Sequence, residues 1–304
     1  MTISLSTMWA QQPRFVEDMH AFVHATRALG YDAIEVSHST PEVPFKRLLD
    51  FHQVPISSIH APAPLVRDAT DRANSKLNLA AIDDDERLEA IRYTKASIDY
   101  TKEVGGKFVV VHLGAVGNEM FDAERELRRL YDSGTRDGAR VEELREECHR
   151  LRREQIDPWL EMASQTLGKL AAYAGEREIA LGIENRLHYH EIPQPEEARW
   201  LVDDYAPDAV GYWHDVGHAE VQDRLSLVDK RLWLDTNGPR CNGCHLHDVT
   251  GLADHRAPGN GDVDWTYIRD GIPAGALRVF EINQSQPEKD VAGAIPFLRA
   301  RGVI

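Results

Sequence analysis

Eight short apolar runs recur along the chain, and they constrain the fold more than any other feature of the sequence. Each run is short enough for a buried strand, whereas a buried helix would need a longer one. The last residues of most runs are polar or ionisable. The runs span residues 3–9, 33–37, 54–60, 107–113, 179–184, 209–213, 241–246 and 277–282.

Helical patterns separate these runs, which predicts the order strand, helix, strand along the whole chain. Strands connected in this way are parallel, and about eight of them in 304 residues favour a closed (β/α)8 TIM barrel over an open doubly wound sheet. No glycine-rich phosphate-binding motif follows the first run, so the usual mark of a nucleotide-binding open sheet is missing. The expected helices are 15–29, 45–51, 84–104, 156–174, 195–205, 265–270 and 287–301.

Two connections are unusually long. After the fourth strand, residues 121–155 are rich in Arg and Glu and contain a glycine-bearing break at 133–138. We interpret this stretch as an inserted helical hairpin that forms a lid or joins copies of the chain in a homo-oligomer, with a plain solvated helix as the alternative. Residues 61–85 begin Ala-Pro-Ala-Pro and predict a loop over the barrel mouth. No linker divides residues 1–304, so we expect a single domain.

Composition narrows the partners and the compartment. The formal net charge of −15 argues against nucleic acid as a partner, because proteins that bind phosphate backbones usually carry a basic face. No run approaches the roughly 18 apolar residues of a membrane span, and no signal peptide is recognisable. We therefore expect a cytoplasmic protein that acts on a small molecule. Cys241 and Cys244 are interpreted as structural thiols, with a metal or redox role as the alternative.

Carboxylates and imidazoles gather at the C-terminal ends of the predicted strands. In (β/α) barrels, side chains from many strands meet there in one cavity. A single histidine or glutamate at such a place is usually structural, but their joint occurrence favours a metal-dependent active site. The residues are Glu35, His60, His112, Glu184, Asp215 with His218, His245 with His247 and Asp248, and Glu281.

Seven motifs lie at or near these strand ends, and they follow one another in chain order from the third strand to the last. They are Ser58-Ile59-His60-Ala61-Pro62, Val111-His112-Leu113-Gly114, Ile183-Glu184-Asn185-Arg186, His214-Asp215-Val216-Gly217-His218, His245-Leu246-His247-Asp248, His255-Arg256-Ala257-Pro258-Gly259-Asn260-Gly261 and Phe280-Glu281-Ile282-Asn283. In these motifs the chain resembles the xylose isomerase-like (β/α) barrels, a family that includes sugar isomerases and epimerases, inosose dehydratase and type IV apurinic endonucleases. The resemblance covers nearly the whole chain and implies the same barrel.

The resemblance implies a divalent metal bound by Glu184, Asp215, His245 and Glu281. Mn²⁺ is the first choice for this oxygen-rich set, and Zn²⁺, Co²⁺ or Mg²⁺ are the others. In the epimerase branch the metal holds two adjacent oxygens of a ketose and stabilises an enediolate, while Glu184 and Glu281 act as the paired acid and base. The implied activity is a metal-dependent isomerase or epimerase of a sugar or sugar derivative.

Further residues are implied as contacts to substrate or to a second metal. His188 and Arg256 are placed to bind substrate hydroxyls or a phosphate group, and an ion pair with Asp254 or Asp248 is the alternative for Arg256. Aromatic residues near the ligands could stack on a sugar, although packing is the plainer role. The histidines that could serve a second metal or the substrate are His60, His112, His218 and His255. The aromatic residues are Trp9, Tyr189, Trp213 and Trp265.

Two other activities stay open within the same family. A metal-dependent lyase or dehydratase acting on a keto-sugar or cyclic polyol would use the same enolate chemistry. A multi-zinc apurinic endonuclease is less well supported, because a metal-binding aspartate of that branch falls on Ala253, with Asp254 one place off. An enzyme that binds duplex DNA would also be expected to carry Lys and Arg in the loops after the strands, where Arg256 is the one basic residue that we identify. His214, next to Asp215 on an extended segment, should point the other way and pack against a helix.

Overall fold

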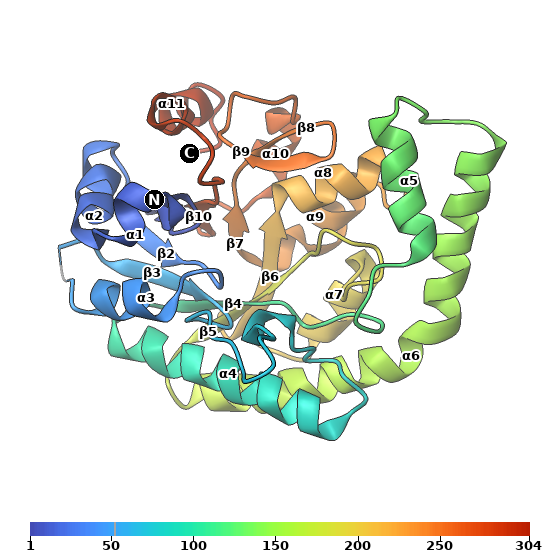
Figure 1. The fold of residues 1–304 in the computed structure, drawn as a ribbon, viewed down its shortest axis with the longest axis horizontal. Helices are drawn as coiled ribbons and strands as arrows, with labels where there is room; N and C mark the ends of the chain where they lie inside the picture. Colours follow the sequence, from blue (N-terminus) through green and yellow to red (C-terminus); the bar gives the residue numbers. More distant parts are fainter. Residues whose placement is uncertain (52) are drawn as a thin grey trace.

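The computed structural model of the protein describes residues 1–51 and 53–304. Eight parallel strands close into a barrel with the ring order β1-β10-β7-β6-β5-β4-β3-β2 (Figure 1). All eight predicted runs are confirmed as strands of this barrel, and the predicted TIM barrel is confirmed as the fold. The strands are β1 (Ile3–Ser6), β2 (Ala33–Val36), β3 (Ile56–His60), β4 (Phe108–Val111), β5 (Ala180–Glu184), β6 (Val210–Asp215), β7 (Cys241–His245) and β10 (Leu277–Phe280).

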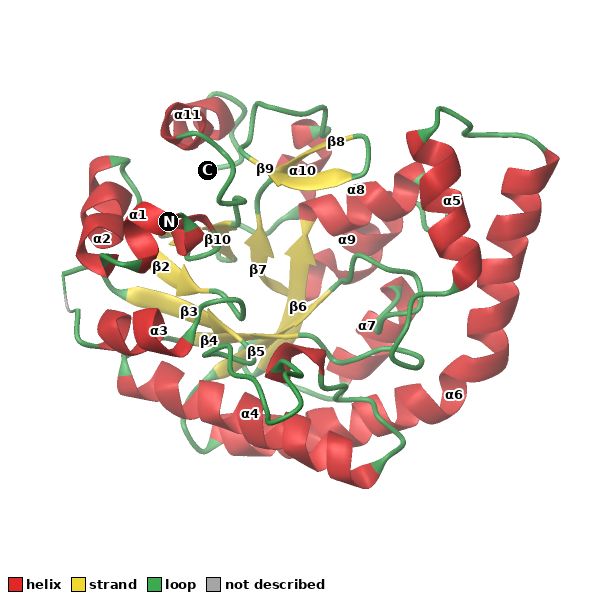
Figure 2. Cartoon of the chain, viewed as in Figure 1, coloured by secondary structure: helices red, strands yellow, loops and turns green. Residues whose placement is uncertain are grey.

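Helices surround the barrel on its outside (Figure 2). Two of them, α8 and α9, are missing from the sequence prediction. Helix α8 follows β6 without a connecting loop, and Asp215, the last residue of β6, is also its N-cap, so no turn signal separates the two elements. The helices are α1 (Pro13–Val16), α2 (Met19–Ala28), α3 (Glu42–Leu49), α4 (Asp84–Glu103), α5 (Asp122–Asp132), α6 (Ala139–Gly175), α7 (Pro195–Asp203), α8 (Val216–Arg224), α9 (Arg231–Asn237), α10 (Trp265–Gly271) and α11 (Glu288–Arg299).

The prediction of one helix over 15–29 is wrong, because the structure divides this stretch into α1 and α2. The carboxylate of Asp18 accepts hydrogen bonds from the backbone N–H groups of His20 and Ala21, at 3.0 and 3.2 Å, and so starts a second helix. Buried Phe15, Met19 and Phe22 continue across the break. Their spacing therefore resembles the apolar face of a single helix.

The inserted hairpin is present, but its second arm is not a separate helix. Helix α5 and the first part of α6 form the hairpin around the predicted break, and α6, which is 37 residues long in all, then continues through the expected helix 156–174. Figure 1 shows α6 changing direction on its way from the hairpin to the underside of the barrel. Pro158 lies inside α6, where it removes one backbone hydrogen bond and favours such a bend.

A short antiparallel hairpin of β8 (Asp248–Thr250) and β9 (Ala253–Arg256) lies outside the barrel, beyond the tip of β7 (Figure 1). Its strands are too short and too polar to be recognised as strands in the sequence. Within the described residues, no helix combines the length and the apolar character that crossing a membrane would require.

Trp213 fills the inside of the barrel beneath its mouth. The side chain is fully buried and packs with Val110, Leu277 and Val279, which belong to other strands of the ring. Glycines on the two strands beside β6 make room for the indole ring. A Cβ atom on Gly182 would lie 2.6 Å from Cε3 of Trp213, and one on Gly243 would collide with the ring from the other side. The indole also contacts the ring of His245 edge to face, with ring centroids 5.4 Å apart, and so lies directly next to the polar side chains of the mouth.

Candidate metal centre and substrate pocket

Four neighbouring strands of the ring, β5, β6, β7 and β10, bring together the four predicted metal ligands Glu184, Asp215, His245 and Glu281. Because the strands are parallel, these side chains meet at one end of the barrel. One ligand atom from each residue lies within 4.8 Å of the others. The Nδ1 atom of His245 is their common neighbour. It lies 2.6 Å from Glu184 Oε1, 3.5 Å from Asp215 Oδ2 and 3.2 Å from Glu281 Oε2.

The chemistry of this cluster fits a divalent cation. The three carboxylates of Glu184, Asp215 and Glu281 are at most 1% exposed, and burial of several anions requires compensating positive charge. Within the described residues, Oε1 of Glu281 has no hydrogen-bond partner, although buried polar atoms nearly always have one. Three carboxylates with one imidazole form a ligand set typical of Mn²⁺ or Zn²⁺.

When no ion is bound, protonated histidines supply part of the positive charge that compensates the buried carboxylates. Burial acts to raise the pKa of Glu184, but the charges of His60 and His245 outweigh it and hold this pKa well below its ordinary range. Burial in turn acts to lower the pKa of His245, yet the carboxylates of Glu281, Glu35 and Glu184 raise it well above its ordinary value. A bound cation would displace the proton from Nδ1 of His245.

Glu35 at the end of β2 holds His245 in place. Its Oε1 atom lies 2.9 Å from Nε2 of His245, and its Oε2 atom accepts a hydrogen bond of 2.7 Å from the Ser58 hydroxyl. All three side chains are fully buried. With Nε2–H donated to Glu35, Nδ1 is the nitrogen that faces the carboxylate cluster, an arrangement often found behind metal-binding histidines. Glu35 is recognisable in the sequence as a strand-end carboxylate, but its contact with His245 is not.

Asp215 is fixed from three sides. Its backbone N–H donates to the side-chain oxygen of Asn185 at 2.7 Å, and the Asn185 amide donates to its carbonyl at 2.8 Å. Its Oδ1 atom accepts from the backbone N–H of His218 at 2.7 Å. Nε2 of His247 lies 3.0 Å from both carboxylate oxygens. A Cβ atom on Gly217 would collide with the His247 ring, so this position requires glycine.

His214 points away from the cluster, as predicted from the alternation along the strand. Its Nδ1 atom lies 2.8 Å from the hydroxyl of Tyr212. The Tyr212 ring is stacked on Trp233 of α9, with ring centroids 6.3 Å apart and an interplanar angle of 4°. His214 therefore belongs to the helix-facing side of β6, and burial lowers its pKa to about 3.

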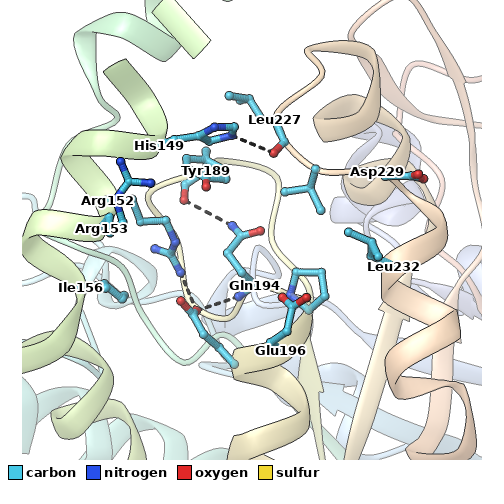
Figure 3. Close-up of a pocket in the computed structure, with 13 residues that line it drawn as sticks. His149, Arg152, Arg153, Ile156, Tyr189, Gln194, Glu196, Leu227, Asp229 and Leu232 are labelled. Carbon is cyan, nitrogen blue, oxygen red and sulfur yellow. Dashed lines mark hydrogen bonds and ion pairs between the residues drawn. The ribbon is translucent and has the colours of Figure 1, made fainter. Parts of the chain in front are cut away.

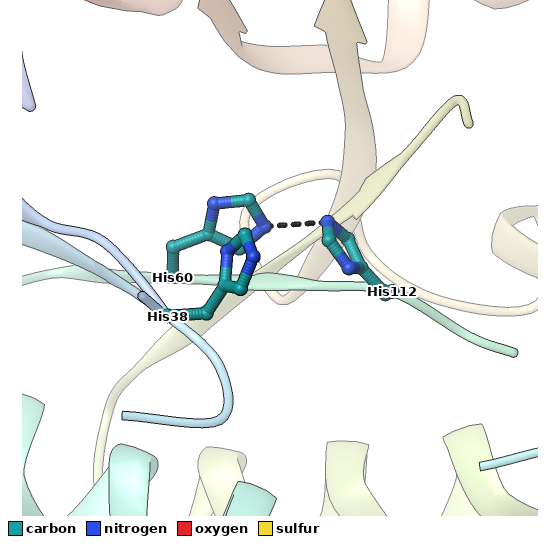
Figure 4. A group of neighbouring side chains, drawn as sticks. All are labelled: His38, His60 and His112. Carbon is teal, nitrogen blue, oxygen red and sulfur yellow. Dashed lines mark hydrogen bonds between the residues drawn. The ribbon is translucent and has the colours of Figure 1, made fainter. Parts of the chain in front are cut away.

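A second group of ligand-type atoms consists of His38, His60 and His112 (Figure 4). The Nε2 atoms of His60 and His112 lie 2.6 Å apart, and that of His112 lies 2.6 Å from Oε2 of Glu184. The ring of His38 lies 4.6 Å from that of His60 between centroids, and its Nδ1 atom is buried without a hydrogen-bond partner among the described residues. The sequence analysis missed His38 because it follows β2 by two residues and closes no apolar run.

A third group combines His218, Asp254 and His255. Nδ1 of His255 lies 3.1 Å from Oδ1 of Asp254, and Nε2 of His218 lies 4.0 Å from Oδ2. Adjacent residues of a strand normally point in opposite directions, but His255 has a φ of 53°, in the left-handed region that favours glycine. This backbone turn brings Asp254 and His255 to the same side. The one-residue offset seen in the sequence therefore does not exclude Asp254 from the group.

A cavity of about 630 Å³ opens beside the cluster of predicted ligands. It shares His112 and Arg186 with the surroundings of Glu184, since Nη1 of Arg186 donates to Glu184 Oε2 at 3.0 Å. The predicted loop 61–85 contributes a wall, and His188 from the β5–α7 connection faces the same cavity. The lining includes His38, Arg72, Lys76, His112, Arg186 and His188. The mouth thus has three basic side chains, Arg72, Lys76 and Arg186, that the sequence analysis did not assign to it.

Arg256 is not among the residues that line this cavity. Its Nε atom donates to the backbone carbonyl of Asn260 at 2.9 Å, within its own loop. In the described part of the chain it forms no ion pair with Asp254 or Asp248. The carboxylate of Asp248 accepts backbone hydrogen bonds from Gly259 and Val263 instead. A substrate contact by Arg256 therefore stays a prediction.

A family model described as a xylose isomerase-like TIM barrel matches residues 23–301. The chain belongs to this family. Solved structures with the same fold include a D-tagatose 3-epimerase-like protein, with 19% identity, a TM-score of 0.67 and coverage of 99% of this chain and 97% of the other. A search of curated proteins returned no match.

Two further solved structures are similar to this xylose isomerase-like barrel. One is 3-keto-D-glucoside 4-epimerase, YcjR, from E. coli, with 17% identity, a TM-score of 0.65 and coverage of 99% of each chain. The other is IOLI protein with a bound zinc atom, with 13% identity, a TM-score of 0.64 and coverage of 100% of this chain and 98% of the other. At these identities the likeness establishes the barrel alone.

Three of the four aromatic residues named above and the two thiols are buried in this xylose isomerase-like barrel, whereas Tyr189 is partly exposed. Trp9, Trp213 and Trp265 are at most 4% exposed and lie outside the lining of the 630 Å³ cavity. Cys241 and Cys244 are free and buried, burial raises the pKa of both thiols, and neither belongs to a group of potential metal ligands in the described residues. The structural interpretation of these residues thus agrees with their burial.

A second cavity, of about 510 Å³, lies outside the barrel between α6, the start of α7 and the α8–α9 connection (Figure 3). Its lining contains His149, Arg152, Tyr189 and Gln194 but none of the predicted metal ligands. Buried Arg152 and partly exposed Glu197 form an ion pair in its lining, and Glu197 also accepts from the backbone N–H of Gln194 at 2.8 Å. This cavity borders the place where the inserted hairpin meets the β5–α7 connection.

Proposed function

We propose that the protein is a divalent-metal-dependent isomerase or epimerase of a sugar or sugar derivative. The observation that carries this proposal is the position of Glu184 and Glu281 on either side of Asp215 and His245, next to a cavity of about 630 Å³. Two relatives of the same fold are described as a D-tagatose 3-epimerase-like protein and a 3-keto-D-glucoside 4-epimerase, which agrees with the proposal. Mn²⁺ is the ion we put first.

The two glutamates are suited to move a proton at a carbon next to a carbonyl. A bound divalent ion would polarise that carbonyl and stabilise the negative charge that develops on the substrate oxygens. Oε1 of Glu281 has no hydrogen-bond partner among the described residues. Glu184 reaches the cluster from β5, which is separated from β10 by β6 and β7 in the ring. One carboxylate would remove the proton and the other would return one from the opposite face.

The remaining polar side chains would bind the substrate. His188 lines the cavity and could accept or donate to a sugar hydroxyl. Lys76 and Arg72 belong to the same lining and could bind the charge of a phosphorylated sugar. His60, His112, His218 and His255 are proposed either as further substrate contacts or as ligands of a second ion.

Exchange of solvent deuterium into a panel of ketoses, free and phosphorylated, tests this proposal. Glu184→Gln and Glu281→Gln should each lose exchange. Because both residues are also proposed as ligands, metal content must be measured in every variant, and Asp215→Asn serves as a control that loses a ligand without losing a proposed base. Undiminished exchange in both glutamine variants would remove the mechanism.

A lyase or dehydratase acting on a keto-sugar or cyclic polyol is the alternative within the same chemistry. It would begin with the same proton abstraction but would eliminate water afterwards. Mass spectrometry of the product separates the two, because an epimerase leaves the mass of the substrate unchanged and a dehydratase lowers it by one water.

The two neighbouring ligand groups favour phosphodiester hydrolysis as a second candidate function. Together they contain His38, His60, His112, His218, Asp254 and His255 around the central cluster. The net charge of −15 argues against binding of duplex DNA. Counting bound metal by mass spectrometry addresses this directly: two or three zinc ions per chain, together with cleavage at an abasic site, would favour hydrolysis over sugar chemistry.

A further inference from the structure

The inserted hairpin contacts four successive residues of the β5–α7 connection. Arg128 of α5 donates to the carbonyl of Leu187 at 3.0 Å. Glu124, also on α5, lies 3.1 Å from Nδ1 of His188 and accepts from the backbone N–H of Tyr189 at 2.9 Å. Arg152 of α6 reaches the carbonyl of His190 at 3.5 Å. The chain that carries His188 into the substrate cavity is therefore held along its length by the hairpin.

The hairpin is itself anchored on its other side. Arg145 and His149 of α6 contact the carbonyls of Leu225 and Leu227, at 3.0 and 3.1 Å, beyond the end of α8. Figure 3 shows His149 next to Leu227, with Arg152 and Tyr189 on the same wall. Apolar residues complete the contact. They are Leu127, Val141, Leu144 and Cys148, all at most 4% exposed. So many buried contacts are typical of a fixed wall, and a mobile lid would have few.

Glu124 stands out within this contact because its carboxylate is fully buried on a helix whose outer face is highly charged. Arg128 lies 2.9 Å from Glu124 Oε1, and the side chain of Arg128 is 16% exposed. Burial acts to raise the pKa of Glu124, but the His188 hydrogen bond and the Arg128 charge outweigh it, so this pKa is lowered. Glu124 is therefore an ionised acceptor for both the side chain of His188 and the backbone N–H of Tyr189.

We infer that Glu124 is a positioning residue for the substrate site: it accepts the Nδ1–H of His188 and so turns Nε2 of that imidazole into the cavity. This inference rests on the proposed function, in which His188 contacts the substrate. The hairpin then acts as a fixed wall that shapes the site, in place of the lid considered from the sequence. With Nδ1–H donated to Glu124, Nε2 is the ring nitrogen of His188 that a substrate hydroxyl would meet.

The first test needs no substrate. Nitrogen-15 NMR of the side chain reports which ring nitrogen of His188 carries the proton, with His188→Gln used to assign the signal. In the unaltered protein we expect the Nδ1–H tautomer, and in Glu124→Gln a mixture with substantial Nε2–H, because the carboxylate acceptor is gone. An unchanged tautomer in Glu124→Gln would overturn the inference. Glu124→Asp, which keeps the charge but retracts it, gives a second measurement if Glu124→Gln folds poorly.

The second test uses whichever sugar the protein turns over. Loss of the positioning contact should raise KM about tenfold or more and change kcat by less than about threefold. If Glu124 acts through His188, adding Glu124→Gln to His188→Gln should cause no further loss, whereas additive losses would contradict the inference. Glu126→Gln is the matched control, since Glu126 lies on the same helix and pairs with Arg140 away from the connection. If no sugar is turned over, the proposed function fails, and the tautomer measurement still decides the inference.

Discussion

Nε2 of His245 lies 2.9 Å from a carboxylate oxygen of Glu35, and this contact leaves Nδ1 to face Glu184, Asp215 and Glu281. The two residues are 210 positions apart in the chain and meet because β2 and β7 belong to the same closed ring. The orientation of the only imidazole in the central cluster of described residues is thus decided by a carboxylate outside that cluster.

Glu35→Gln should weaken metal binding by about 10- to 100-fold, because it removes the negative charge behind His245. A competition titration of the metal-free protein with Mn²⁺ or Zn²⁺ and a chromophoric chelator measures this without any substrate. Glu42→Gln, at the exposed start of α3, removes a charge from the same region and should leave the affinity unchanged. Equal affinities in Glu35→Gln and in the unaltered protein would show that the contact does not tune the site.

Metal removal should lower the midpoint of thermal unfolding, and the metal affinity should rise with pH. An ion present at about 100 times its dissociation constant stabilises the fold by about 2.7 kcal/mol. The carboxylates raise the pKa of His245 well above its ordinary value, so a proton competes with the ion for Nδ1 at neutral pH. Titrations at pH 6.5 and 7.5 should show tighter binding at the higher pH. Asp215→Asn should abolish the thermal shift, and an unchanged midpoint after chelation of the unaltered protein would speak against a resident ion.

Gly182→Ala should destabilise the fold by about 1–3 kcal/mol, because the added methyl group overlaps the Trp213 ring inside the barrel. Trp213→Phe in the same chain should recover part of this loss by making room for the methyl group. Gly293→Ala on α11 is the matched control. A Cβ atom there meets nothing within 4 Å, so this change should leave stability unchanged or raise it by up to about 1 kcal/mol. Urea unfolding measures all three, and equal effects of the two glycine substitutions would contradict the packing argument.

Glu191 should make the fold sensitive to acid. Burial acts to raise its pKa, but the charges of Arg186 and the neighbouring histidines outweigh it and lower the pKa to about 2. A folded-state pKa below the unfolded value of 4.5 means that the ionised carboxylate stabilises the fold above about pH 4.5. That contribution, on the order of 3 kcal/mol at most, is lost as the pH falls from about 4.5 toward 2.

Urea unfolding at pH 6 and pH 3 checks this prediction. Glu191→Gln should be less stable than the unaltered protein at pH 6, and the difference between the two should shrink at pH 3. Glu196→Gln, at the exposed start of α7, is the control and should show no such narrowing. A constant difference for Glu191→Gln at the two pH values would mean that its carboxylate does not titrate in this range.

The barrel could be predicted from local signals, whereas the four proposed ligands were singled out by the family resemblance. An apolar run such as 179–184 indicates a strand by itself, and the parallel ring then places the strand-end residues, with Glu184, Asp215 and Glu281 among them, at the same mouth. The break between α1 and α2 at Asp18 could not be predicted, because the helical spacing of the apolar residues continues across it.

Other features depended on contacts that the sequence does not encode locally. Asp254 joins His218 only through the left-handed backbone at His255, and Glu124 reaches His188 only because the hairpin docks on a connection 64 residues further along the chain. Likewise, the start of α8 is not recognisable in the sequence, because its N-cap Asp215 is also the last residue of strand β6. Sequence by itself therefore determined the architecture and the kinds of side chain that gather at the mouth, since periodicity and strand-end residues are local properties. Tertiary structure alone decided which nitrogen, carboxylate and loop face the site, because those choices follow from how separate elements pack.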